Sequence, residues 1–151
     1  MHILLVADGR SPITRRWIQG LRTLDHRVTL VSTYPCPDIP GVEARYVLPV
    51  AFGNLAGSQV GSTRAAASAG GARKLARRFR SLVVSGRYIL GPLTLPCYGR
   101  RLQRLVHSLQ PDLVHALRIP FEGMLASFAP PEVPLIVSTW GNDLTLHARG
   151  S

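Results

Sequence analysis

Residues 8–12 have a composition suited to binding an anion. Gly9, Arg10 and Ser11 follow an apolar run and directly precede Pro12. Ser11 is a good cap for a helix that begins at Pro12, and the free backbone N–H groups at the start of a helix attract anions. Arg10 adds positive charge there. The segment has a single glycine and is not the three-glycine dinucleotide fingerprint. A capped turn without a ligand is therefore the alternative interpretation.

A second candidate site lies around residue 115. His115 lies near the end of another apolar run, residues 113–116, and Arg118 follows shortly after that run. An imidazole and a guanidinium in this place can bind a sugar hydroxyl or a phosphate. The alternative is that His115 is a buried core residue whose hydrogen bonds are satisfied. Glu122, one turn further, is either an acid for proton transfer or a favourable charge in the first turn of a helix.

The third candidate segment contains Trp140, Gly141, Asn142 and Asp143. An indole ring can stack on the face of a sugar, and glycine permits a close approach of the backbone. The two polar side chains supply donors and acceptors for hydroxyl groups. The alternative is that they cap a short helix. No metal site is predicted, because the two cysteines of the chain lack a metal-binding spacing.

Five apolar runs separated by helical patterns predict an α/β fold: a Rossmann-like, mostly parallel sheet with helices on both faces. The predicted strands are residues 2–7, 28–32, 43–48, 113–116 and 135–138. The third of them has the pattern of a strand near an edge. The predicted inward faces of the helices are Ile13, Trp17, Leu21 and Leu24; Leu102, Leu105, Val106 and Leu109; and Phe121, Met124, Leu125 and Phe128. Ligands bind at the carboxyl ends of the strands in such sheets, so the three candidate segments should meet at one edge.

The middle of the chain is basic, and much of it lacks the hydrophobic periodicity of a helix or a strand. The formal net charge is +10, and no acidic residue occurs between Glu43 and Asp112. Residues 49–71, rich in Gly, Ala and Ser, predict a flexible loop, and residues 72–90 predict a basic amphipathic helix; Pro92 and Pro96 are expected to interrupt the chain again. The arginines expected to face an anionic membrane surface are Arg73, Arg77, Arg78 and Arg80. A solvated basic face is the alternative. Nucleic acid is not favoured as a partner, because no aromatic interleaving or recognition pattern accompanies the charge.

Residues 2–12, the helix with Trp17, residues 111–116 and residues 138–144 resemble the N-terminal domain of family 4 glycosyltransferases. These are retaining enzymes with two Rossmann domains in the GT-B fold. The resemblance covers roughly half of the chain and leaves the middle unmatched. It implies a nucleotide-sugar donor as co-substrate and no further cofactor.

The resemblance also assigns positions. It places Gly9, Arg10 and the adjoining Ser11 toward the donor phosphates. His115, Arg118 and the loop Trp140, Gly141, Asn142 and Asp143 would lie on the acceptor side. Three departures stand against a full match: the first loop lacks paired glycines, Trp140 replaces the histidine of many members, and no Glu-x7-Glu donor motif is present.

The expectation is a single, incomplete N-terminal domain over residues 1–151, with a C-terminal donor domain missing. Such a chain would be inactive alone, cytoplasmic and peripheral to the membrane. The complete enzyme would transfer a sugar to a hydroxyl on a lipid carrier or a polysaccharide. The second hypothesis is a non-catalytic Rossmann-like module that binds a phosphorylated ligand. A weaker third is nucleic-acid binding through the basic middle, which predicts a steep salt dependence.

Overall fold

The computed structural model describes residues 1–52 and 92–140. The predicted loop over most of residues 49–71, the predicted basic helix with Arg73, Arg77, Arg78 and Arg80, and the residues Gly141, Asn142 and Asp143 lie outside the described part.

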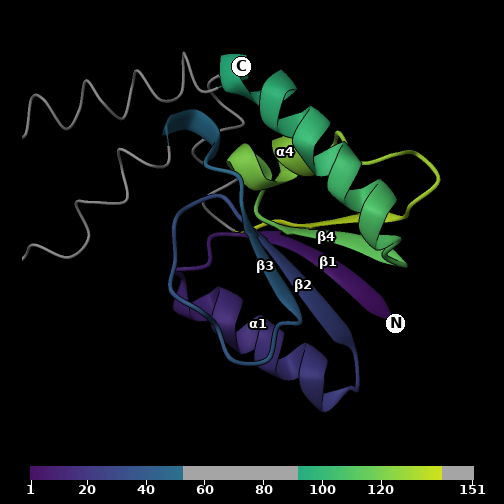
Figure 1. The fold of residues 1–151 in the computed structure, drawn as a ribbon. Coiled ribbons are helices and arrows are strands. Elements are labelled where there is room, and N and C mark those ends of the chain that lie inside the picture. The colour runs from purple at the N-terminus through teal and green to yellow at the C-terminus, as the bar shows by residue number, and fades with distance from the viewer. Residues whose placement is uncertain (53–91, 141–151) are drawn as a thin grey trace, which may run out of the picture.

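The fold is built on one parallel sheet of five strands in the order β3-β2-β1-β4-β5 (Figure 1). Its strands are β1 (His2–Ala7), β2 (Arg27–Ser32), β3 (Ala44–Val47), β4 (Leu113–Leu117) and β5 (Leu135–Ser138). The α/β, Rossmann-like prediction is confirmed. All six residues of β1 are buried, because this strand lies in the centre of the sheet. β3 lies at an edge, as its weaker pattern predicts.

Helices cover both faces of the sheet (Figure 1). Helix α1 (Pro12–Thr23) lies on one face, and a helix over residues 92–109 lies on the other with α4 (Met124–Ala126). Successive side chains of a strand point to opposite faces. Leu5 therefore packs in the core under α1, whereas Leu4 and Val6 pack in the core under the other helices. No helix in the described ranges is long and apolar enough to span a bilayer.

The start of α1 follows the prediction, but its buried face does not. The Ser11 side chain accepts a hydrogen bond from the Ile13 N–H at 3.3 Å, and Pro12 occupies the first turn. Thr14 and Ile18 are the buried residues of the helix, and Leu21 packs beside them, whereas Trp17 is 39% exposed. The predicted stripe was wrong in Ile13, Trp17 and Leu24, all of which are exposed. The side chains that face β1 and β2 form a narrower stripe, and Trp17 lies at its margin against His115.

The helix over residues 92–109 confirms its predicted inward face. Leu102 and Val106 are buried, and Leu105 and Leu109 pack against the same core. The predicted interruption was wrong at Pro96, which lies inside the helix, whereas Pro92 is the first described residue of that helix. Tertiary contacts stabilise this part of the helix: Leu95 is buried in the core, and the Thr94 hydroxyl accepts a hydrogen bond from the Ala51 N–H at 3.0 Å. Ala51 belongs to the short helical turn η1 (Val50–Phe52).

The regular helix predicted over residues 120–128 was wrong. An irregular turn, η3 (Ile119–Gly123), leads into α4, which has only three residues. Pro120 has ψ 129° and Phe121 has φ 63°, so neither is helical. Proline lacks an N–H group and disfavours the helical conformation of the residue before it. Phe121 and Leu125 are buried and Phe128 packs against the core as predicted, but Met124 is 42% exposed.

Candidate functional site

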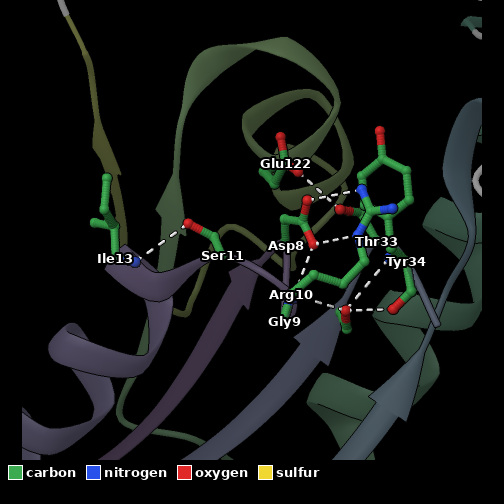
Figure 2. Close-up of polar contacts among 9 residues, drawn as sticks. Asp8, Gly9, Arg10, Ser11, Ile13, Thr33, Tyr34 and Glu122 are labelled. Atoms are coloured by element: carbon green, nitrogen blue, oxygen red, sulfur yellow. Dashed lines mark hydrogen bonds and ion pairs between the residues drawn. The ribbon is translucent and has the colours of Figure 1, made fainter. Parts of the chain in front are cut away.

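Loops from four strands meet at the carboxyl edge of the sheet. They follow β1 at Asp8, β2 at Thr33, β4 at Arg118 and β5 at Trp140. Figure 2 shows the loops after β1 and β2 with Glu122 of η3 beside them. The parallel strand order thus brings the described members of the three predicted segments to one edge, as expected for this class of sheet.

Gly9 is the point of closest approach between the loops after β1 and β2. Its N–H donates to Ser32 Oγ at 3.0 Å. A Cβ atom at this position would lie 2.4 Å from Cys36 Sγ and 3.0 Å from Ser32 Oγ. Glycine is therefore required here by lack of space, and its N–H is already engaged within the protein. The Arg10 N–H is engaged as well, by Asp8 Oδ1 at 2.9 Å.

Arg10 forms a two-pronged ion pair with Asp8 (Figure 2). Its Nε donates to Asp8 Oδ1 at 3.0 Å and its Nη2 to Asp8 Oδ2 at 2.9 Å. The guanidinium also lies 3.5 Å from the centre of the Tyr34 ring, a cation–π contact. Burial alone would lower the pKa of Arg10, but the hydrogen bonds and charges of Asp8 and Tyr34 together outweigh it and raise that pKa. Nη1 is buried and has no hydrogen-bond partner within residues 1–52 and 92–140.

Glu122 is a buried carboxyl at the same edge. It is 5% exposed, and the Thr33 hydroxyl donates to its Oε1 at 2.7 Å (Figure 2). Burial raises the pKa of Glu122 to about 7; the charge of Asp8 adds to this rise, whereas the Thr33 hydrogen bond and the charge of Arg118 oppose it. A carboxyl with this pKa exchanges protons at neutral pH, which is the range useful for acid–base chemistry. The sequence predicts Glu122 either as an acid or as a charge in the first turn of a helix, and it does not predict the burial that raises this pKa. The pairing with Thr33 has no sequence signal beyond the position of Thr33 directly after a strand.

His115 has the environment of a satisfied core residue, the alternative interpretation from sequence. It is 6% exposed, and its Nε2 lies 2.8 Å from Ser138 Oγ. The His115 and Trp17 rings form an edge-to-face contact with their centroids 5.1 Å apart. Burial lowers the pKa of His115, so the ring is neutral at neutral pH. These partners belong to β5 and α1, on the face of the sheet that α1 covers.

Arg118 and Trp140 are brought together as the sequence predicted. The Arg118 guanidinium lies 5.4 Å from the centre of the Trp140 ring. The Arg118 backbone has φ 120°, a conformation that costs free energy for any residue with a side chain. Backbone hydrogen bonds hold it: its N–H donates to the Ser138 carbonyl and its carbonyl accepts from the Gly123 N–H, each at 2.9 Å. Strained positions of this kind concentrate at functional sites.

No group of three or more metal-type ligands occurs among the residues that the structure describes. Comparison with family models, with curated proteins and with solved structures finds no match to this chain. The functional argument therefore rests on the chemistry of the edge itself.

Proposed function

We propose that this chain supplies the N-terminal, acceptor-side part of a retaining glycosyltransferase. In the complete enzyme a second domain would hold a nucleotide-sugar, and the sugar would pass to a hydroxyl on a lipid carrier or a polysaccharide. The observation that carries the proposal is the convergence of Arg10, Glu122, Arg118 and Trp140 at one carboxyl edge of a Rossmann-like sheet. The family resemblance of the flanking segments supports it.

The edge has the chemistry that polyhydroxylated ligands require. Asp8 and Glu122 offer carboxyl oxygens, Arg10 and Arg118 offer N–H donors, and Trp140 offers a flat apolar face. Hydroxyl groups both donate and accept hydrogen bonds, so they suit a mixture of acids and arginines. Gly9, Arg10 and Ser11 are assigned to the donor phosphates. His115 is assigned to supporting the acceptor side from within the sheet.

Tryptophan fluorescence tests the acceptor side. The chain has two tryptophans, and Trp17 lies on α1 beside His115, which makes it an internal control. Carbohydrate acceptors are expected to change the emission of the Trp17→Phe variant, which retains Trp140, and to leave the Trp140→Phe variant unchanged. A response carried by Trp17 alone would contradict the assignment. Turnover of a nucleotide-sugar by the 151-residue chain alone would contradict the division between two domains.

The second candidate is a non-catalytic module that binds a phosphorylated ligand. The guanidinium of Arg10 beside the capped start of α1 favours it, because a guanidinium attracts phosphate. This candidate predicts no response to carbohydrate and loss of phosphate affinity in Arg10→Ala. A glycosyltransferase part responds to both ligands.

A peripheral position on an anionic membrane in the cytoplasm is proposed for the complete enzyme, through Arg73, Arg77, Arg78 and Arg80. Flotation with vesicles tests it. Equal binding to neutral and anionic vesicles would remove the membrane from the proposal.

A further inference from the structure

Two polar networks adjoin at the carboxyl edge of the sheet. One is the Arg10–Asp8 ion pair, with contacts of 3.0 and 2.9 Å. The other is Glu122 with the Thr33 hydroxyl at 2.7 Å. Figure 2 shows the Asp8 and Glu122 side chains beside each other, and the charge of Asp8 acts on Glu122. Asp8 therefore belongs to the first network and acts on the second through its charge.

Arg10 neutralises Asp8 only while its guanidinium stays on that carboxylate. An oxyanion that engages Arg10 would compete with the Asp8 carboxylate for the positive charge of the guanidinium. Asp8 would then act on Glu122 with less compensation, and the oxyanion would add its own negative charge. Solvent screens the interaction weakly, because Glu122 is 5% exposed.

The groups that act on Glu122 come from three strand ends. In the described part of the chain these are Asp8 after β1, the neutral Thr33 after β2 and Arg118 after β4, and a backbone hydrogen bond at Glu122 itself also favours the carboxylate. Arg118 favours the charged carboxylate, whereas Asp8 disfavours it. A change in the charge around Asp8 therefore changes the pKa of Glu122 against the opposing effects of Thr33, the backbone hydrogen bond and Arg118.

We propose that Glu122 takes up a proton when an oxyanion engages Arg10, and that Asp8 links the two events. The inference rests on the donor-phosphate position that the proposed function gives to Arg10. Because linkage is reciprocal, the oxyanion should bind more tightly as the pH falls through the range in which Glu122 titrates. Phosphate-group binding at this edge would thus be sensitive to pH near neutrality.

Carboxyl NMR on the full 151-residue chain tests the coupling, with sulfate as the probe because sulfate itself does not titrate near neutral pH. The chain has three glutamates, so side-chain labelling with 13C gives three signals, and Glu122→Gln assigns one of them. With sulfate in place of chloride at constant ionic strength, the pKa of Glu122 should rise by about half to one unit. Glu43 and Glu132, both exposed, are the internal controls and should not shift.

Two variants separate the coupling from the binding. Without sulfate, Arg10→Gln should raise the pKa of Glu122, because Asp8 loses its counter-charge. Asp8→Asn should lower that pKa and reduce the sulfate response. If sulfate shifts the backbone amides of Gly9 and Arg10 while the Glu122 titration stays fixed, the coupling is overturned and the phosphate position stands. If sulfate shifts no amide in residues 8–11, the phosphate position at Arg10 fails and the inference fails with it.

Discussion

The hydroxyl of Thr33 donates a hydrogen bond to Oε1 of Glu122 at 2.7 Å, across 89 positions of sequence. It joins the end of β2 to the irregular turn that follows β4. The turn reaches this position because Phe121 has φ 63°, which a regular helix would not allow. One buried contact therefore links the backbone irregularity, the raised pKa and the candidate site.

Glu122 should make the stability of the protein depend on pH. Its pKa is about 7 in the folded chain against an ordinary value of 4.5, so between these values the folded state holds a proton that the unfolded state has released. Glu122 should therefore contribute a fall of about 3 kcal/mol in the free energy of unfolding as the pH rises from about 4.5 to 7, and the lowered pKa of His115 opposes part of this fall below pH 6.5. In Glu122→Gln this contribution should be absent, so that the free energy of unfolding no longer falls between pH 5 and pH 8. Urea unfolding at pH 5 and pH 8 measures both.

Glu132→Gln is the matched control, because Glu132 is exposed. Its stability profile should follow that of the wild-type chain. A Glu122→Gln profile that keeps the same fall between pH 5 and pH 8 would show that another group is responsible.

Gly9 and Gly20 should respond in opposite directions to alanine. At Gly9 the added methyl would meet Cys36 Sγ at 2.4 Å and Ser32 Oγ at 3.0 Å, so Gly9→Ala should destabilise the fold by about 1–3 kcal/mol. Gly20 lies inside α1 with nothing within 4 Å of such a methyl, so Gly20→Ala should stabilise it by about 0.5–1 kcal/mol. Thermal unfolding of the two variants measures the difference. Equal effects would mean that Gly9 has room for a side chain.

The contact between Trp17 and His115 should be visible in fluorescence. A protonated imidazole quenches a neighbouring indole, and the pKa of His115 is lowered by burial. In the Trp140→Phe background, emission should fall on acidification with a midpoint below 6.5, the ordinary value for histidine. His115→Gln should remove this step. A step that persists in His115→Gln, or one centred above 6.5, would assign the quenching to another group.

The strands were predictable because buried parallel strands are continuous apolar runs, as β1 and β4 are. The cap at Ser11 was also predictable, because it is a contact between residues that are close in sequence. The contacts of Arg10 were not predictable from the sequence. Its guanidinium is held by Asp8 two residues earlier and by Tyr34 on the next strand end, and residue types alone do not choose between these partners and a ligand.

The burial of Glu122 was hidden from sequence analysis because it depends on a local break in helical geometry. Periodicity placed Phe121 and Leu125 inward correctly, yet it assumed one regular helix and so placed Met124 inward as well. The positive φ at Phe121 rotates the following residues relative to that pattern. Sequence patterns predict which residues seek burial more readily than they predict the backbone that arranges them.

Gly99 and Phe128 should show a strong coupling in a double-mutant cycle. A methyl at Gly99 would lie 2.3 Å from Cγ and 2.4 Å from Cδ1 of the Phe128 ring, which packs against the core on the side of the helix over residues 92–109. Gly99→Ala should therefore destabilise the fold by about 1–3 kcal/mol through overpacking, although alanine favours a helix. Phe128→Leu alone should cost about 1 kcal/mol as buried area is lost.

The double variant should be more stable than the sum of the two single effects predicts, because the smaller leucine leaves room for the added methyl. Urea unfolding of the four proteins in the cycle gives the interaction free energy. Additive effects would show that the Gly99 methyl is accommodated without the ring moving, and the close packing of this helix against Phe128 would then be wrong.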